Sequence, residues 1–302
     1  MALIPLIREA RMRAGAFFNF NGTAGAWRRK CIETAGGWTH DTLTEDLDLS
    51  YRAQLLGWRF VSAPTVVAPA ELPAGVEALE SQQRRWAKGS IQTARKLLPA
   101  VFSRPLPLRV KIEAFFHLTN NFAYPLLLLS GLLLLPVMMS ASSAEPRLAA
   151  ALNVGVIFTG VVPVCAFLAV GRLAAGARGW SIVRDVIAVL VLGAGLSVNN
   201  SWAVLQGLGR RVGDWDRTPK TGDGRARMSL KPYAAKRSWT GWIELLLALY
   251  FAWLTALAWW GGHVRSMPFL VLLLAGLTYV GALSVRERVA RPTPKSTRAV
   301  GG

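Results

Sequence analysis

The chain has 302 residues, of which 52% are hydrophobic and 17% are charged, and its formal net charge at pH 7 is +18. So large a hydrophobic share excludes an ordinary soluble protein and predicts a membrane-embedded part. The Lys and Arg residues gather beside apolar segments, at 104–111, 210–237 and 286–298. This placement is typical of loops that face anionic lipid, and no zinc spacing or stacking motif accompanies it, so nucleic-acid binding is not expected.

The two cysteines, Cys31 and Cys165, are too few for a disulfide framework or a thiolate metal site. Cys31 lies in the polar first third of the chain, whereas Cys165 lies inside an apolar segment. We expect both to be packing residues.

Residues 1–111 mix glycine, tryptophan and charged residues as a soluble domain does, and their pattern predicts an α/β arrangement. A glycine-rich stretch at 21–25 precedes a helix that is expected to start at Arg28. A second helix is expected over 45–56, because apolar residues recur there at helical spacing and Gly57 follows as a terminator.

Two further elements are expected in this first domain. Residues 58–61 read as a short strand, and residues 76–98 read as one long helix rich in Gln, Arg and Lys. Because proline disrupts the interior of a helix, Pro99 is expected to end it. The last turn of that helix should then lie near the bilayer.

Residues 112–285 predict an all-α transmembrane bundle. A helix rises about 1.5 Å per residue, so about 20 apolar residues cross a hydrocarbon core of roughly 30 Å. The segments expected to span are Ala114–Met139, Leu148–Val170, Trp242–Trp260 and Pro268–Ser284. The loop between the first two carries little charge, which predicts that it lies outside and that residues 1–111 are cytoplasmic. The basic tail 286–302 is expected to be disordered.

A further apolar stretch, 182–208, carries Arg184 and Asp185 near its start and Asn199 near its end. If it crossed the membrane, the basic loop 209–237 would lie outside, against the positive-inside tendency. We therefore interpret this stretch as one interfacial helix on the cytoplasmic face.

Thr44, Glu45 and Asp46 form the sequence TED at the start of the helix expected over 45–56. Helix-end amides favour a carboxylate there and keep it ionised, and an ionised carboxylate beside a sugar hydroxyl can act as a general base. The alternative is a helix cap with acidic residues in the first turn, which the spacing alone favours.

Gln82, Arg85 and Trp86 form the sequence QxxRW on the helix expected over 76–98. Arginine offers a fork for a pyrophosphate, glutamine offers amide hydrogen bonds, and tryptophan offers a flat apolar face for a sugar ring. The alternative is an amphipathic helix whose basic residues meet lipid headgroups and whose tryptophan anchors at the interface.

TED followed by QxxRW just before membrane spans resembles the family 2 glycosyltransferases of the cellulose synthase and glucomannan (mannan) synthase type. Phe18–Gly25 resembles the acceptor-side loop of that family, and Trp215–Lys220 resembles its cytoplasmic gating loop. The resemblance implies an α/β remnant of a GT-A type glycosyltransferase domain. This domain is expected to be followed by four spans, an interfacial helix and a gating-like loop at 209–237.

The resemblance also implies an inverting transfer of a hexose from a UDP- or GDP-sugar to a glycan or glycolipid acceptor, as in processive β-glycan synthases. Asp46, flanked by Thr44 and Glu45, would be the catalytic base. The implied acceptor-binding residues are Trp86, Asn21, Gly22 and Thr23. The implied nucleotide- and diphosphate-binding residues are Gln82, Arg85, Arg217, Thr218 and Lys220. The alternative for Phe18–Gly25 is a plain turn, and the alternative for Trp215–Lys220 is a solvated basic segment.

Members of this family also need an earlier Asp for the nucleotide and a DxD pair that holds Mg²⁺ or Mn²⁺. Neither occurs before Phe17, and Asp46 with Asp48 has DxD spacing within the TED helix. No metal ligand is therefore assigned. The interpretation is a carboxy-terminal portion that lacks the donor half and needs a separate amino-terminal half.

Two other functions stay open on the sequence. One is a noncatalytic or truncated membrane component, and the other is a glycolipid synthase of the glucosyldiacylglycerol type. A transporter is disfavoured, because the expected spans contain almost no charged residue. Charge placement together with the resemblance predicts a multi-pass protein of the inner (plasma) membrane whose soluble portion is cytoplasmic.

Overall fold

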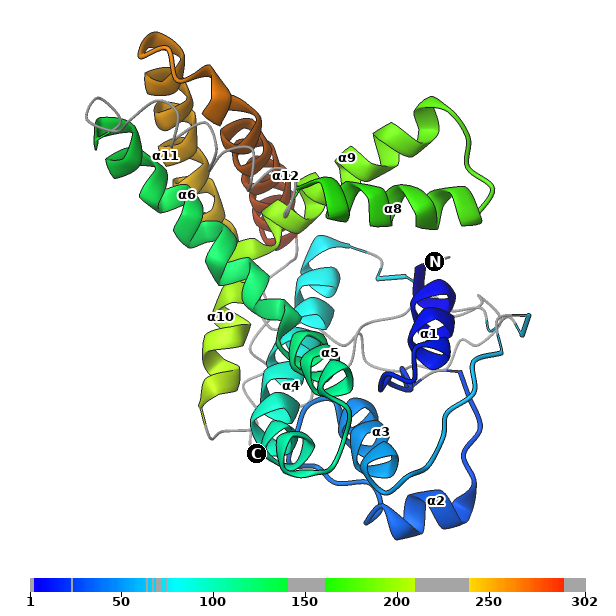
Figure 1. Cartoon of the computed structure of the whole chain (residues 1–302). Helices are drawn as coiled ribbons and strands as arrows, with labels where there is room; N and C mark the ends of the chain where they lie inside the picture. The colour runs from blue at the N-terminus through cyan, green and yellow to red at the C-terminus, as the bar shows by residue number, and fades with distance from the viewer. Residues whose placement is uncertain are drawn as a thin grey trace, which may run out of the picture.

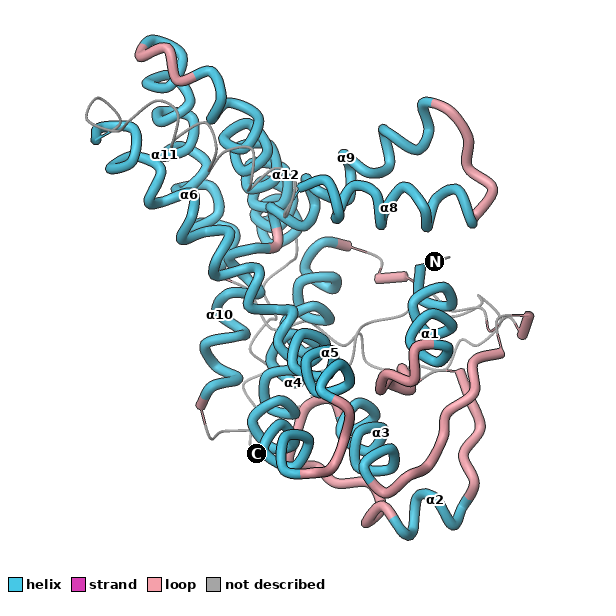
Figure 2. The backbone as a smooth tube through the Cα atoms, viewed as in Figure 1, coloured by secondary structure: helices cyan, strands magenta, loops and turns pink. Residues whose placement is uncertain are grey.

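The computed structural model describes residues 3–22, 24–63, 65–66, 68, 72–73, 75–140, 161–209 and 239–290. These residues form helices and loops, and none of them lies in a β-strand (Figure 2). The first helices along the chain are α1 (Leu3–Arg13), α2 (Arg29–Thr34), α3 (Glu45–Leu55) and α4 (Val76–Ser103). The helices expected from Arg28 and over 45–56 are thus confirmed as α2 and α3.

The strand expected at 58–61 is wrong, because these residues form an extended loop with no neighbouring strand. Trp58 and Phe60 instead pack on a small cluster that contains Cys31 and Leu49. Aromatic residues predict a strand where a sheet can pair with it, and the described residues offer no such sheet. The expected α/β character is therefore not seen in this part of the chain.

Pro99 does not end α4, which continues to Ser103. Leu97 and Val101 lie on either side of the proline, and both are buried in the main core of the amino-terminal part. Burial of these side chains offsets the hydrogen bond that a proline removes from a helix.

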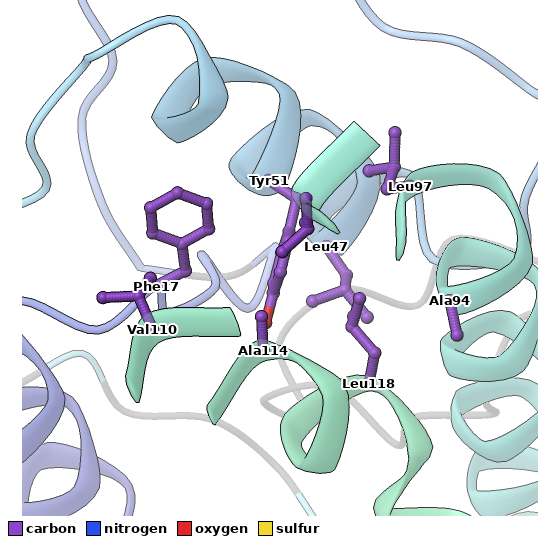
Figure 3. Close-up of a cluster of buried hydrophobic side chains, with 9 residues drawn as sticks. Phe17, Leu47, Tyr51, Ala94, Leu97, Val110, Ala114 and Leu118 are labelled. Atoms are coloured by element: carbon purple, nitrogen blue, oxygen red, sulfur yellow. The ribbon is translucent and has the colours of Figure 1, made fainter. Parts of the chain in front are cut away.

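That core joins α3, α4 and α5 (Leu108–Thr119), as Figure 3 shows. Phe17 and Tyr51 meet edge to face with their ring centroids 5.6 Å apart. The buried members of the core are Phe17, Leu47, Tyr51, Ala94, Leu97, Val101, Val110, Ala114 and Leu118. Because α5 supplies three of these residues and then leads into an apolar helix, the core fixes the amino-terminal part to the start of that helix.

Three described helical segments are long and apolar enough to cross a membrane: Leu108–Met139, Thr240–Trp260 and Val264–Ala290. The first joins α5, the short η1 (Asn120–Phe122) and α6 (Ala123–Ser140), and the second is α11. The third joins η3 (Val264–Ser266) and α12 (Met267–Ala290). Figure 1 shows α6, α11 and α12 running together. The three segments contain the expected spans Ala114–Met139, Trp242–Trp260 and Pro268–Ser284. α12 extends into the expected tail as far as Ala290.

The expected span Leu148–Val170 lies largely outside the described residues. Its described end is the start of α8 (Val162–Ala174), a helix of 13 residues that packs against α9 (Trp180–Gly195).

The single interfacial helix expected over 182–208 is wrong, because two helices occupy this stretch. α9 ends at Gly195, and α10 (Ser197–Leu208) leaves it at an angle of 53°. Gly195 lies so close to α12 that a Cβ atom there would be 2.4 Å from the carbonyl oxygen of Gly276. α9 therefore packs on the bundle, whereas α10 packs on α4 and α6. Taken together, the bent pair is apolar enough for a fourth span, so its membrane placement stays a prediction.

Candidate active site

Asp46 lies in the first turn of α3, where its Oδ1 accepts a hydrogen bond from the Leu47 amide at 2.8 Å. Thr44 precedes the helix and makes no side-chain capping bond. Its buried hydroxyl lies 3.3 Å from the Thr93 hydroxyl of α4 instead. The helix-cap alternative is therefore wrong for the Thr44 side chain, which packs between α3 and α4.

Side chains on one face of α3 bind the backbone of the loop 18–25. The Phe18 amide donates to Gln54 Oε1 at 3.1 Å, and Gln54 Nε2 donates to the Phe18 carbonyl at 2.8 Å. The Phe20 amide donates to the Ser50 hydroxyl at 2.9 Å. Residues 46, 50 and 54 are spaced by four, so they share a helix face, and the loop follows this face towards Asp46.

Gly22 reaches the Asp46 carboxylate at the end of this loop. Its φ is +73°, and a Cβ atom built on it would lie 3.1 Å from Asp46 Oδ2. Glycine adopts such a φ without the steric penalty that other residues meet. Asn19 Nδ2 donates to Asn21 Oδ1 at 2.6 Å in the turn just before it. The backbone of Gly22 thus forms one wall beside the carboxylate.

One face of α4 contacts the TED segment. A Cβ atom on Gly89 would lie 2.5 Å from Thr44 Cγ2 and 2.8 Å from the Thr44 amide nitrogen, so the two segments touch there. The Leu43 amide donates to Gln92 Oε1 at 3.0 Å. Seven residues recur on this face at helical spacing: Gln82, Arg85, Trp86, Gly89, Gln92, Thr93 and Lys96. QxxRW is thus the first part of a longer stripe, which we call the TED-facing stripe.

Asp48 belongs to an ion-pair network rather than to the open side of the site. Its carboxylate is fully buried and lies 2.7 Å from Arg52 Nε and 2.9 Å from Lys96 Nζ. The Thr39 hydroxyl donates to it at 3.0 Å. These partners tie α3 to the end of the TED-facing stripe, and they leave Asp46 as the acidic residue beside Gly22.

Burial raises the pKa of the Asp46 carboxyl above its ordinary value, and the negative charge of Glu45 acts in the same direction. The Leu47 amide and the Arg85 guanidinium lower that pKa, without cancelling the effect of burial. The helix end therefore lowers the pKa of this carboxyl, as expected, but burial raises that pKa by more. A higher pKa makes the ionised carboxylate a stronger proton acceptor.

The structure brings Asp46, Gly22 and Arg85 near one another, because Arg85 acts electrostatically on Asp46 and a Cβ atom on Gly22 would lie 3.1 Å from Asp46 Oδ2. Gln82 shares a helix face with Arg85 and is partly buried, whereas the Trp86 side chain is 47% exposed. Glu45 is partly exposed and Asn21 lies in the loop before Gly22. The remaining predicted site residues lie outside the described residues: Thr23, Arg217, Thr218 and Lys220.

The side chains around Asp46 do not suit a Mg²⁺ or Mn²⁺ site. In the part of the chain that the structure describes, no three His, Cys, Asp or Glu side chains come together in a way that could hold a metal ion. Asp48 has DxD spacing to Asp46, but its carboxylate is held by Arg52 and Lys96. A divalent cation of this kind prefers several carboxylate or carbonyl oxygens, which this arrangement does not offer.

Two cavities flank the site. One of about 720 Å³ lies beside the loop 18–25 and is lined mainly by residues of 18–28 and 58–68. Trp27 stands in its wall, with its ring centroid 5.0 Å from that of Phe60 and 5.8 Å from that of Phe20. The other, of about 330 Å³, is lined by Asp41, Thr42, Gln92, Arg95, Lys96 and Gly209. The first is aromatic enough to pack against further polypeptide or a sugar.

Sequence reasoning missed Ser50 and Gln54 on α3, as well as Gln92, Thr93 and Lys96 on α4. Ser50 and Gln54 follow Asp46 by four and eight residues, which is the spacing of one helix face. The residues on α4 continue the spacing of QxxRW in the same way. A search for polar residues in register with each motif could therefore have found them.

The comparisons with known proteins agree with these motifs. The family model described as Glycosyl transferase family group 2 matches residues 4–171. "Probable glucomannan 4-beta-mannosyltransferase 10" of Arabidopsis thaliana is 39% identical over 117 residues, which is 39% of this chain and 21% of that protein. "Glucomannan 4-beta-mannosyltransferase 1" of Oryza sativa subsp. japonica is 40% identical over 115 residues, 38% of this chain and 22% of that protein. No solved structure matches this chain.

The chain spans about a fifth of the length of these curated relatives. The family model, in contrast, covers more than half of the chain. The matched residues include Gly22, Asp46 and Arg85, which the structure brings together. The chain therefore belongs to glycosyltransferase family group 2 and is cellulose synthase-like in its motifs.

Proposed function

We propose that this chain is the acceptor-side and membrane portion of an inverting glycosyltransferase that transfers a hexose from a UDP- or GDP-sugar to a glycan or glycolipid acceptor. The observation that carries the proposal is the Asp46 carboxylate, which lies against the Gly22 backbone within the electrostatic reach of Arg85. Its pKa is raised by burial, which suits a general base.

In the proposed reaction Asp46 takes the proton of the acceptor hydroxyl. The hydroxyl oxygen forms a bond to the anomeric carbon of the donor, and the bond from that carbon to the diphosphate breaks. Arg85 and Gln82 hold the leaving diphosphate by charge-assisted and amide hydrogen bonds. Trp86 stacks on the acceptor sugar, and Asn21, Gly22 and Thr23 line the acceptor end. Arg217, Thr218 and Lys220 are proposed to close over the nucleotide.

The hexose is proposed to be mannose, because the similar proteins are named as glucomannan 4-beta-mannosyltransferases. Transfer to a 4-hydroxyl of a β-glycan, repeated without release of the product, is the corresponding acceptor chemistry. A glycolipid acceptor is the enzymatic alternative.

We further propose that residues 1–111 are the acceptor-side part of an α/β domain of the GT-A type. The aromatic cavity of about 720 Å³ supports this, because apolar walls of this extent favour packing against another polypeptide segment. That segment is a separate amino-terminal half, which would supply the nucleotide site and the ligands for Mg²⁺ or Mn²⁺.

The segment 112–285 is proposed to lie in the inner (plasma) membrane, with residues 1–111 in the cytoplasm. The long apolar helices support a bilayer location. The basic residues at 104–111 and after Ser284 support the orientation, because Lys and Arg favour the cytoplasmic side.

The experiment is a transfer assay on membranes that contain this chain, with and without the amino-terminal half of a similar mannosyltransferase. GDP-mannose and UDP-glucose are supplied with Mg²⁺ or Mn²⁺, and the configuration of the product is read by NMR. The proposal predicts a β-linked mannoside from the α-linked donor when both halves are present. An α-linked product would exclude the inverting mechanism, and no transfer under any condition would favour the noncatalytic membrane component.

A further inference from the structure

Arg84 and Arg85 are neighbours in α4, yet they serve different elements. Successive residues of an α-helix point about 100° apart, because the helix has about 3.6 residues per turn. Arg85 belongs to the TED-facing stripe, whereas Arg84 contacts α10. Arg84 Nε and Nη2 donate to Asn199 Oδ1 at 2.9 and 2.7 Å.

Asn199 is fully buried in the first turn of α10, and its amide group is fully used. The two bonds from Arg84 occupy Oδ1, while Nδ2 donates to the Glu80 carbonyl at 3.0 Å and to Asn200 Oδ1 at 2.9 Å. An amide side chain has two donors and two acceptor positions, so none is left over. Because an unpaired buried amide is costly, this arrangement fixes the start of α10 on α4.

Arg95 holds the other end of α10. It lies eleven residues after Arg84, which is about three helical turns and therefore the same face of α4. Its Nη1 donates to the Gly207 carbonyl at 3.2 Å and also to the Gly209 carbonyl. The last carbonyls of a helix lack partners within the helix, and a basic side chain satisfies them.

Small apolar side chains fill the space between the two arginines. Ala87 and Ile91 of α4 are buried against Ala203 and Val204 of α10. Gly207 adds a close approach, since a Cβ atom there would lie 2.8 Å from Ile91 Cβ. Contacts among small residues bring two helices together but specify their rotation weakly, whereas directional hydrogen bonds specify it strongly.

We propose that Arg84 and Arg95 are positioning residues that bind the two ends of α10 and thereby fix the rotation of α4 that turns the TED-facing stripe towards Asp46. Their importance for catalysis rests on the function proposed above. α10 contacts α6, and α9 before it packs on α12 through Gly195, so α10 carries the position of the bundle to α4.

The test measures the rotation of α4 at its opposite face, without donor or acceptor. Thr44→Cys and Thr93→Cys are introduced together into the full chain, in which Cys31→Ser and Cys165→Ser remove the native thiols. The two hydroxyls lie 3.3 Å apart, so thiols in their place should oxidise readily to a disulfide. The rate of this cross-linking in detergent reports whether α4 presents its TED-facing stripe to α3.

We expect Arg84→Ala and Asn199→Ala each to slow the cross-linking about tenfold, since either leaves a buried polar group without its partner. The double variant should be no slower than Asn199→Ala alone, because Asn199→Ala already removes both hydrogen bonds from Arg84. Arg84→Lys, which keeps one donor, should recover part of the rate. Arg95→Ala should slow the reaction independently, because it acts at the other end of α10.

Val204→Ala is the matched control, because it makes a cavity in the same interface without removing a hydrogen bond. It should lower the melting temperature and leave the cross-linking rate at that of the parent chain. The proposal is overturned if Arg84→Ala cross-links at the parental rate, or if Val204→Ala slows the reaction as much as Arg84→Ala does. Because no sugar is involved, this result stands apart from any failure of the transferase assay.

Discussion

At the scale of single residues, the chemistry of the site depends on how the protein treats one carboxylate. Asp46 is partly buried, and this burial raises its pKa, while the Leu47 amide and Arg85 lower it. A side chain at position 22 would crowd the carboxylate, because a Cβ atom on Gly22 would lie 3.1 Å from Asp46 Oδ2. A raised pKa suits the proposed role of Asp46 as a general base.

The pH dependence of transfer should reflect this environment. A general base acts in its deprotonated form, so the rate falls as the pH falls through the pKa of Asp46. Because that pKa is raised, the acidic limb should lie above the range of an ordinary aspartate. Glu45→Gln removes a negative charge that raises the pKa, so it should move the acidic limb to lower pH. The profile of kcat/KM against pH for the parent and the variant checks this, and an unmoved limb would assign it to another group.

Gly22→Ala should reduce transfer about tenfold or more, because the new Cβ would crowd Asp46 Oδ2 at 3.1 Å. The variant also places a non-glycine residue at a φ of +73°, which costs about 1–2 kcal/mol of stability. Gly37→Ala is the matched control, since Gly37 has a φ of +71° and a Cβ atom there would meet nothing within 4 Å. Both variants should lose similar stability in thermal melts. Equal loss of transfer in the two would show that backbone strain, not the carboxylate, is responsible.

At the scale of elements, α4 is the central helix of the amino-terminal part, because two of its faces bind different neighbours. The TED-facing stripe contacts residues 43–44, just before α3, through Gly89, Gln92 and Thr93. Another face of α4 presents Arg84 and Arg95 to α10. A single helix thereby sets the distance between the proposed base and the proposed diphosphate ligands.

Gly89→Ala should destabilise the protein by about 1–3 kcal/mol, because a Cβ atom would lie 2.8 Å from the Thr44 backbone nitrogen, which cannot move aside freely. Helix propensity alone predicts the reverse, a gain of about 1 kcal/mol for alanine over glycine. Gly193→Ala in α9 supplies that comparison, since a Cβ atom at Gly193 would have open space for 4 Å around it. Melting temperatures in detergent separate the two effects, and a Gly89→Ala variant as stable as the parent would contradict the close contact of α3 with α4.

Some of these elements could be predicted from the sequence, and others could not. Local spacing predicts α3 and most of α4, and it predicts three of the apolar helices, because apolar periodicity and length are written into the chain itself. The pairing of Asp46 with Arg85 follows from two motifs seen together. The continuation of α4 through Pro99, the break after Gly195 and the turn of Thr44 towards Thr93 depend on distant neighbours. Tertiary packing decides such features, and a single sequence does not display it.

At the scale of the whole molecule, the bundle of apolar helices and the amino-terminal part are joined at more than one place. α10 links α6 to α4, and Glu287 of α12 binds the start of α4 from far along the chain. Its carboxylate accepts the Val76 amide at 2.8 Å and the Glu77 amide at 3.1 Å. A carboxylate at a helix N-terminus accepts hydrogen bonds from amides that lack partners within the helix, and it is attracted to the positive end of the helix dipole. The last apolar helix therefore helps to define where the QxxRW helix begins.

Glu287→Ala should lower stability by about 1–2 kcal/mol, the usual effect of removing a helix cap. Glu287→Gln keeps acceptor capacity but loses the charge, so it should lie between the alanine variant and the parent. Arg286→Ala, at the neighbouring exposed position, should leave the melting temperature unchanged within the precision of a surface substitution. Unfolding in detergent followed by circular dichroism gives the comparison. A Glu287→Ala variant with parental stability would mean that α4 does not need this link.

The most direct measurement compares the transfer rate and the thermal stability of the parent chain with those of Asp46→Asn. Asparagine keeps the shape of the side chain and an oxygen for the Leu47 amide, but it cannot accept the proton. We expect transfer to fall about a hundredfold or more, with equal or slightly greater stability, because burial disfavours the charged form that the variant removes. Transfer at the parental rate would contradict the assignment of Asp46 as the catalytic base, and with it the central claim about this site.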